Sequence, residues 1–257
     1  MSVEKALSIP YNIMKKYPKV VLPAVLSWIP SILILMLVSS VVGNFNISSW
    51  SEQLEDYLSS SSILKYATYF SSILVLYILI DVFLRTYFQI VVFERKKNIS
   101  QMIEKAKRYF WRMLWTLILK NVVLLLIVLA GILPILLVAV LPAIALLSIP
   151  LMLLAILAAI VIQIMFYPLP AIVVKENKSG IEALKRSIEF SRKNFWSLVL
   201  LLIIIWVISS ILSFILSPLL SVKTLYITIP IYSIIWLFVE AFFQMLPASF
   251  YVSSKRQ

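Results

Sequence analysis

The sequence predicts an all-α fold, a polytopic transmembrane helical bundle of about six spans that forms a single membrane domain over residues 1–257. Of these residues, 62% are hydrophobic and only 13% are charged, whereas a soluble domain carries about 25% charged residues. Long apolar runs alternate with short basic segments, and the runs approach the roughly 20 residues that cross a bilayer. A chain with so little polar surface needs lipid as its solvent.

Four spans are bounded by charged segments or by proline. They cover residues 20–42, 63–93, 197–216 and 226–250, and Ser217-Pro218 ends the third of these. Proline removes a backbone donor and bends a helix, so kinks are expected at Pro23, Pro30, Pro168, Pro170, Pro230 and Pro247.

Two further spans follow from the length of the longest apolar run. No residue between 122 and 162 is charged, and one straight helix of that length would measure about 60 Å, twice the hydrocarbon thickness. The run must therefore fold back on itself. Gly131, Pro134 and Pro142 are expected to supply the turn.

The Lys and Arg residues predict the orientation. Four precede the first span, seven lie in residues 94–112, six lie in residues 175–194 and two end the chain, so that 19 of 23 lie on one side. The opposite loops hold Lys65, Lys223, Glu52, Glu55 and Asp56. Cytoplasmic loops carry the excess of Lys and Arg. We therefore expect a multi-pass protein of the cell membrane with both termini cytoplasmic.

Three basic segments have the apolar periodicity of amphipathic helices. They are residues 2–17, 98–110 and 179–195, with Lys and Arg on the polar side, as in helices that lie in the membrane interface. Asn98 and Gln101 can cap the second, and Ser179 with Glu182 predicts a capping box for the third. The expected apolar faces are Val3, Leu7, Met14 and Tyr17; Ile99, Met102, Ile103, Ala106, Tyr109 and Phe110; and Ile181, Leu184, Ile188 and Phe195.

The basic faces of these helices have two interpretations. They hold candidate contacts for anionic lipid headgroups or for a protein partner, or they serve only to anchor and orient the chain. The candidate headgroup contacts are Lys105, Lys107, Arg108, Lys185, Arg186, Arg192 and Lys193.

The sequence also indicates three repeats of one unit, over residues 1–93, 94–174 and 175–257. Each unit has a basic amphipathic helix, a span outward and a span inward. Val91-Val92-Phe93-Glu94 matches Val173-Val174-Lys175-Glu176, and Leu169-Pro170-Ala171 matches Leu246-Pro247-Ala248. Superposing these matches aligns Asp81 with Gln163 and Gln163 with Glu240. The units would be related by an axis along the membrane normal.

Polar residues inside the spans are candidates for function because they are costly in lipid. We expect a cluster in the inner half of the bundle that binds a cation, a proton or a lipid headgroup. Its members are Asp81, Arg85, Lys120, Gln163, Glu240 and Gln244.

The structural alternative assigns these residues no ligand. Asp81 and Arg85, four residues apart on one helix face, would form a salt bridge. Lys120 would extend to the headgroups, and Gln163 would form hydrogen bonds between helices.

The composition excludes several functions. The chain has no Cys and no His, and only three Gly. Imidazole bases, thiol nucleophiles, ordinary zinc sites and glycine-rich phosphate loops are therefore excluded. We expect no catalytic residues, no cofactor and no metal. The net charge of +12 lies between the spans, so it indicates membrane orientation and not nucleic-acid binding. The Cys-free, Lys-rich composition is a weak indication of a thermophile.

Residues 166–196 resemble a known family. They contain Leu169-Pro170-Ala171-Ile172-Val173 followed by Glu176, then Ala183-Leu184-Lys185-Arg186-Ser187 and Asn194-Phe195-Trp196. This pattern is similar to the six-helix membrane domain attached to some glycerophosphodiester phosphodiesterases and to its stand-alone prokaryotic relatives of unknown function. The resemblance implies a membrane module that serves another activity or moves something. The phosphodiesterase barrel is not in this sequence, so its activity is not implied.

Three functions stay open at this point. The first is a non-enzymatic accessory or scaffold module at the cytoplasmic leaflet that works with a partner protein or with lipids. The second is a small transporter, channel or lipid-translocating protein that uses the polar cluster. The third is a lipid-modifying membrane enzyme. The oligomeric state does not follow from the sequence.

Overall fold

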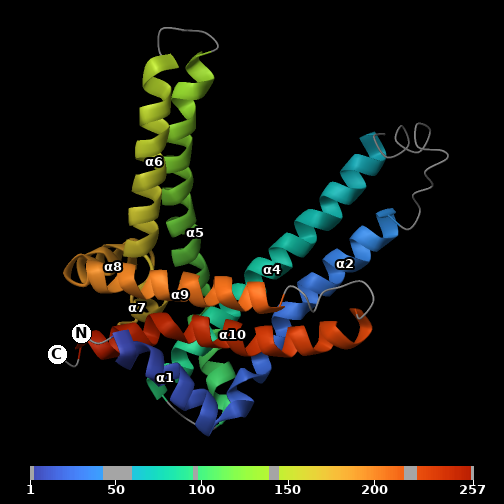
Figure 1. Ribbon diagram of the computed structural model, residues 1–257, viewed down its shortest axis with the longest axis vertical. Coiled ribbons are helices and arrows are strands. Elements are labelled where there is room, and N and C mark those ends of the chain that lie inside the picture. The colour runs from blue at the N-terminus through green and yellow to red at the C-terminus, as the bar shows by residue number, and fades with distance from the viewer. Residues whose placement is uncertain (1–2, 43–59, 95–97, 139–144, 217–224, 256–257) are drawn as a thin grey trace.

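The computed structural model describes residues 3–42, 60–94, 98–138, 145–216 and 225–255, and within these ranges it is helical with no strand (Figure 1). The expected all-α fold is confirmed. The elements are α1 Val3–Lys16, the 3-10 helix η1 Pro18–Ser27, α2 Trp28–Val42, α4 Ser60–Glu94, α5 Ile99–Val138, α6 Ala145–Met165, α7 Leu169–Lys175, α8 Gly180–Lys193, α9 Phe195–Leu216 and α10 Leu225–Lys255.

Five stretches of the described residues are long and apolar enough to cross a bilayer. They lie in α4, α5, α6 together with α7, α9 and α10. A sixth is obtained if α1 and the helix beginning at Pro18, which are bent by 100° at their junction, count as one broken span. The outer faces of the long helices carry exposed apolar side chains such as Leu125, Leu129 and Leu154. The chain is therefore an integral, multi-pass membrane protein.

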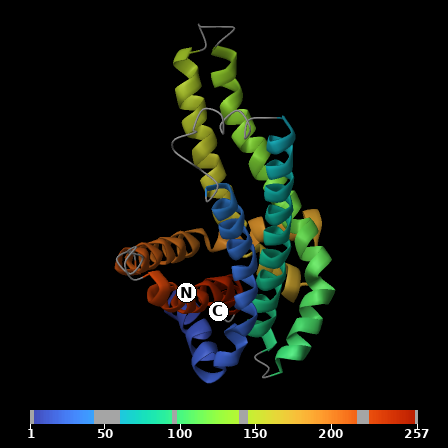
Figure 2. The same ribbon diagram turned by 90° about the vertical axis from the view of Figure 1, so that its right-hand side faces the viewer.

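Pairs of long helices diverge from a common base (Figures 1 and 2). The α2–α4 pair and the α5–α6 pair point away in different directions, and α9 and α10 lie across the molecule in a third. At the base, α10 packs on α1, α4 and α7, while α7 also contacts α5 and α8. The two ends of the chain lie close together there. Whether the three units are repeats of one another stays a prediction.

The short helix α7 is the centre of the base. All of its residues from Leu169 to Val174 are buried. The chain breaks between α6 and α7 because Pro168 and Pro170 lack backbone donors, as expected from the sequence. The carbonyl of Met165, at the end of α6, accepts hydrogen bonds from the hydroxyls of Ser187 and Ser191, each at 2.8 Å. These bonds attach α8 to the break.

The turn expected within the longest apolar run is corrected. Gly131 and Pro134 do not form the turn, because α5 continues through both to Val138; Pro142 lies outside the described residues. Gly131 instead permits close packing, since a Cβ there would overlap the Cβ of Ala155 on α6. Small residues let membrane helices approach in this way. Helix α10 also runs uninterrupted through Pro230 and Pro247.

The first span also differs from a plain α-helix. Residues 20–42 are helical as expected, but the first part, η1, has 3-10 geometry. Pro18 and Pro23 remove two donors from this stretch, which weakens the i to i−4 bonding of an α-helix. At the end of η1, the hydroxyl of Ser27 donates back to the carbonyl of Ala24 at 2.7 Å.

The amphipathic segments are partly as expected. Residues 98–110 are not a separate helix but the first turns of α5, with Asn98 accepting a bond from the Ser100 backbone N–H at 3.1 Å. On α8, Ala183, Leu184, Ser187, Phe190 and Ser191 are buried, whereas Ile181 is exposed. On α1, Val3, Leu7 and Met14 pack against the core as expected, and so does Tyr17, which directly follows this helix.

The capping box expected at the start of α8 is wrong. Ser179 is the N-cap residue, but its side chain makes no capping hydrogen bond. The Gly180 N–H instead donates to the hydroxyl of Thr116 on α5 at 2.8 Å. Gly180 has a φ of +60°, a conformation that glycine adopts without the steric cost of a Cβ.

Glu176, which follows α7, joins three elements at the base. Its carboxylate accepts hydrogen bonds from the Tyr251 hydroxyl, from Lys255 Nζ at 3.1 Å and from Arg186 Nε at 3.1 Å. Burial alone would raise the pKa of Glu176, but the bonds from Tyr251, Lys255 and Arg186 outweigh it and hold this pKa below its ordinary value. The carboxylate therefore holds α8 and α10 to the end of α7.

We predict that Gly131→Ala separates α5 from α6. The added methyl group overlaps Ala155, and such overpacking costs about 1–3 kcal/mol, which exceeds the gain in helix propensity of about 1 kcal/mol. Thermal unfolding in detergent should show a lower midpoint. Adding Ala155→Gly should restore it, whereas adding Ala158→Gly at an exposed position should not. A Gly131→Ala protein as stable as the original would contradict the close packing.

We predict that Glu176 makes the base sensitive to acid. Its folded-state pKa is depressed, so its stabilisation is full above the unfolded-state pKa and is lost as the pH falls through the folded value. Glu176→Gln should lower the free energy of unfolding at neutral pH by about 1–3 kcal/mol and flatten its decline in acid. Unfolding followed against pH, with the exposed Glu104→Gln as control, measures both. An unchanged acid limb in Glu176→Gln would contradict this assignment.

Candidate functional site

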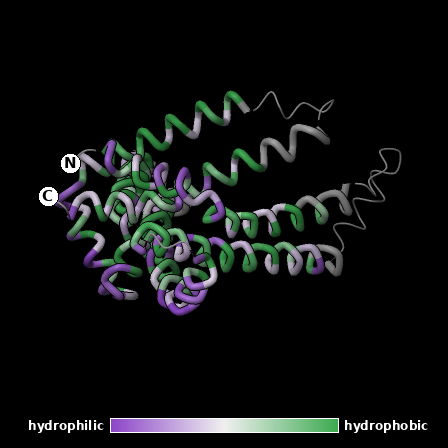
Figure 3. Tube along the Cα trace, turned by 90° about the horizontal axis from the view of Figure 1, so that it is seen from below, coloured by the Kyte–Doolittle hydropathy of each residue, from purple (hydrophilic) through white to green (hydrophobic). Residues whose placement is uncertain are grey.

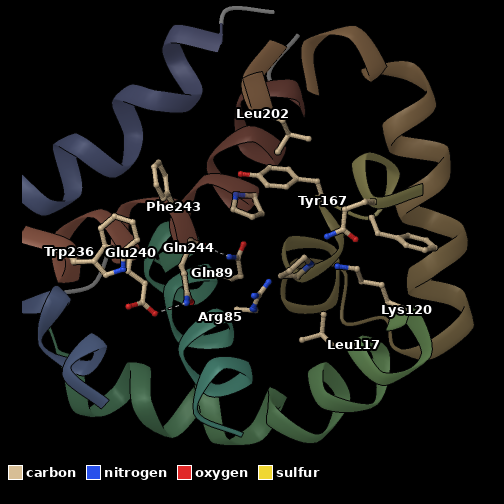
Figure 4. Close-up of a pocket in the computed structure, with 14 residues that line it drawn as sticks. Arg85, Gln89, Leu117, Lys120, Tyr167, Leu202, Trp236, Glu240, Phe243 and Gln244 are labelled. Carbon is tan, nitrogen blue, oxygen red and sulfur yellow. Dashed lines mark hydrogen bonds between the residues drawn. The ribbon is translucent and has the colours of Figure 1, made fainter. Parts of the chain in front are cut away.

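A cavity of about 400 Å³ lies where the long helices converge (Figure 4). Side chains from α4, α5, α6, α9 and α10 and from the break before α7 line it, so residues far apart in the sequence face a common space. The lining residues are Arg85, Gln89, Leu117, Lys120, Gln163, Phe166, Tyr167, Pro170, Leu202, Trp236, Glu240, Phe243, Gln244 and Pro247.

The structure brings most of the expected polar cluster to this cavity. Arg85, Lys120, Gln163, Glu240 and Gln244 line it, and they come from four different helices. Asp81 does not line the cavity. It lies one turn earlier on α4 and forms the expected salt bridge with Arg85, with Arg85 Nε donating to its Oδ2 at 2.6 Å. The expected polar cluster and the expected Asp81–Arg85 salt bridge are therefore both present.

The Glu240 carboxylate lies at one end of the cavity. The one proton of the Ser27 hydroxyl is shared between the Ala24 carbonyl and the Oε2 of this carboxylate, which lies 2.9 Å from the hydroxyl oxygen, and Gln244 Nε2 donates to Oε1 at 3.3 Å. The ring of Trp236 lies beside the carboxylate in Figure 4. The bond from Ser27 connects the end of η1 to α10 and fixes the position of the carboxylate.

The Lys120 ammonium points into the other side of the cavity (Figure 4). Within the described residues it makes no hydrogen bond and no ion pair, and Glu240 likewise forms no ion pair. The hydroxyl of Thr116, one turn earlier on α5, donates a hydrogen bond to the Arg112 carbonyl at 2.7 Å. The cavity thus holds one cation and one anion that have no charged partner in the described chain.

Three buried polar atoms around the cavity lack a hydrogen-bond partner. They are Gln89 Oε1, Tyr167 Oη and Gln244 Oε1. Gln89 is only 1% exposed, and its Nε2 donates to the Gln244 carbonyl at 2.6 Å, which fixes the orientation of its amide. Buried polar groups are nearly always paired. These atoms therefore offer hydrogen bonds to a ligand in the cavity.

The sequence interpretation missed Gln89 and did not include Tyr167 among the site residues. A signal for Gln89 was present, because Asp81, Arg85 and Gln89 recur every four residues and so share one face of α4. A signal for Tyr167 was also present, because the superposition that aligns Asp81 with Gln163 and Gln163 with Glu240 also aligns Arg85 with Tyr167 and Tyr167 with Gln244.

The basic residues expected to contact lipid fall into two groups. Lys105 pairs with Glu94, Arg108 with Glu104 at 2.5 Å, and Arg186 with both Glu176 and Glu189. Lys107, Lys185, Arg192 and Lys193 are exposed and form no ion pair within the described residues. The basic residues 95–97 and the charged loop residues Glu52, Glu55, Asp56 and Lys223 lie outside the described residues.

The cavity combines polar groups with apolar walls formed by residues such as Leu117, Phe166 and Leu202. No three His, Cys, Asp or Glu side chains in the described ranges lie close enough together to hold a metal ion. The lining therefore suits an organic ligand with a polar end and an apolar end.

Comparison of the chain with family models, with curated proteins and with solved structures finds no match. The fold and the apolar outer surface define the class, an integral multi-pass membrane protein of α-helices. The resemblance of residues 166–196 to a phosphodiesterase-associated membrane domain stays a prediction.

We predict that Lys120 is not needed for stability. An unpaired cation within a membrane span costs about 2.5–3.5 kcal/mol on insertion scales, so Lys120→Met should raise the free energy of unfolding by about 1–3 kcal/mol. Asp81→Asn should lower it by about 1 kcal/mol, because Arg85 loses the partner of a part-exposed pair. Unfolding in detergent compares the two variants. A marked loss of stability in Lys120→Met would show that this cation has a structural partner.

Proposed function

We propose that the chain is a non-enzymatic integral membrane protein that binds a lipid in its central cavity and serves as an accessory module at the cytoplasmic leaflet. The observation that carries this proposal is a cavity within the membrane helices where unpartnered polar atoms lie beside apolar walls.

The size and lining of the cavity support a lipid as the ligand. A volume of about 400 Å³ is within the usual range of roughly 300–1,000 Å³ for ligand pockets and is far larger than a single ion requires. Lipid hydrocarbon supplies no hydrogen bonds to Gln89, Tyr167 or Gln244. A lipid headgroup supplies them and leaves the adjoining chains against Leu117, Phe166 and Leu202.

The distribution of charge supports the cytoplasmic orientation. The hydrophilic parts of the trace gather around the base, where both termini lie, and the helices leading away from it are hydrophobic (Figure 3). Basic residues of α1, α8 and the start of α5 belong to this base. By the positive-inside rule, the base faces the cytoplasm and the cavity lies in the inner part of the bundle.

An accessory role follows from the chemistry that the cavity lacks. It has no His and no Cys, and Asp81 is engaged by Arg85. A lipid bound there is held and not processed. A module that holds lipid acts through a partner protein or through the lipid itself, and the exposed Lys107, Lys185 and Arg192 offer a basic surface for either.

Transport or lipid translocation is the second candidate function. The presence of Glu240 and the Asp81–Arg85 pair within spans favours it, because ionisable groups inside membranes mark pathways for ions and substrates. Flux of an ion or of labelled lipid across proteoliposomes that contain only this protein would support transport. Absence of flux together with lipid binding would support the accessory role.

We predict that the purified protein retains lipid and that the cavity is responsible. Lys120→Met combined with Gln244→Leu removes a cation and an acceptor from the site, so retention should fall by about tenfold or more. Native mass spectrometry of the protein extracted in mild detergent measures the retained lipid.

The matched control is Lys65→Met combined with Gln101→Leu, two exposed residues on α4 and α5. It should retain as much lipid as the original protein. Equal retention by the cavity variant and the control would contradict the proposed site, and turnover of the bound lipid would contradict the non-enzymatic assignment.

A further inference from the structure

The cavity has charge of opposite sign at its two ends, and this inference rests on the proposed function. We infer that the cavity selects a zwitterionic phospholipid headgroup, with the phosphate at Lys120 and the ammonium group at Glu240. Figure 4 shows these two side chains on opposite sides of the cavity, with Arg85 and Gln89 between them.

The balance of charges carries the argument. Four ionisable side chains belong to the cluster, and two of them, Asp81 and Arg85, neutralise each other at 2.6 Å. The remaining Lys120 and Glu240 form no ion pair with each other or with any described residue. Separated charges in a medium of low dielectric constant are costly, and a ligand that neutralises both lowers this cost. A zwitterion does so with no net change in charge.

The end at Glu240 has the features of an ammonium site. Ser27 and Gln244 each donate a hydrogen bond to the carboxylate and hold it in place. Gln244 Oε1 is a buried acceptor without a donor. Trp236 shares a face of α10 with Glu240, and its ring lies beside the carboxylate. A carboxylate beside an aromatic ring attracts an organic cation through charge and through cation–π contact.

The end at Lys120 has the features of a phosphate site. The ammonium offers three donors, and it points into the cavity without a partner among the described residues. Arg85 uses Nε for Asp81, which leaves the outer edge of its guanidinium group facing the cavity. Donors that carry positive charge make the stronger hydrogen bonds with phosphate oxygens.

Other headgroups match the cavity less well. A headgroup with a net negative charge, such as phosphoglycerol, satisfies Lys120 but leaves Glu240 opposite no cation. Inorganic phosphate fills only one end and places no cation at Glu240. A phospholipid with an ammonium group pairs with both charges, and its chains reach the apolar walls.

The test measures the binding of short-chain lipids to the full chain in detergent. Native mass spectrometry gives the affinity for dihexanoyl phosphatidylethanolamine, phosphatidylcholine and phosphatidylglycerol, and free phosphoethanolamine and inorganic phosphate are titrated as headgroup probes. The original protein should bind both zwitterionic lipids about tenfold more tightly than phosphatidylglycerol. The two probes without chains should bind more weakly than either zwitterionic lipid.

Two variants separate the ends of the cavity. Glu240→Gln should reduce the preference for the zwitterionic lipids over phosphatidylglycerol to within about threefold. Phosphatidylglycerol should still bind, because only the partner of the ammonium group is removed. Lys120→Gln should weaken all three lipids. Glu189→Gln and Lys65→Gln, exposed residues away from the cavity, serve as controls and should match the original protein.

The outcomes distinguish this inference from the function on which it rests. Equal binding of phosphatidylglycerol by the original protein, or an unchanged preference in Glu240→Gln, overturns the zwitterion assignment while lipid binding stands. If free phosphoethanolamine binds as tightly as phosphatidylethanolamine, the ligand of the cavity is not a lipid. Lipid binding that is insensitive to Lys120→Gln overturns the cavity site itself, and with it the proposed function.

Discussion

The absence of water from the bilayer interior is the constraint on which the structure depends. Each polar group in a span needs a partner within the protein or in a ligand. Most groups here find one locally: Thr86 and Ser249 donate to carbonyls one turn earlier, at 2.7 and 3.0 Å, and Arg85 is paired with Asp81. Among the described residues, three buried polar atoms without a partner, Gln89 Oε1, Tyr167 Oη and Gln244 Oε1, belong to side chains that line a single cavity.

The base of the bundle makes this arrangement possible. The short helix α7 interrupts what would otherwise be one long span, and its buried residues hold α4, α5, α8 and α10 together. Glu176 and the two serines that bond to the Met165 carbonyl fasten α8 and α10 to it. Because the long helices diverge from this point, the space between their lower turns remains unfilled and becomes the cavity.

Composition and periodicity were sufficient to predict the helical membrane fold, the position of most spans and five residues that line the cavity. The Asp81–Arg85 bridge also followed from spacing alone. The break before α7 was only partly predictable, since proline marks a bend but does not specify its direction. The role of Gly131 and the attachment of Gly180 to Thr116 depend on contacts between distant segments. No pattern within one segment contains that information.

The most direct test of this account is an experimental density map of the protein in nanodiscs that contain phosphatidylethanolamine. The account predicts density for a headgroup in the cavity, with its phosphate within hydrogen-bonding distance of Lys120 and its amine at Glu240. A map in which these two side chains pair with each other or with other residues, and the cavity is closed, would contradict it.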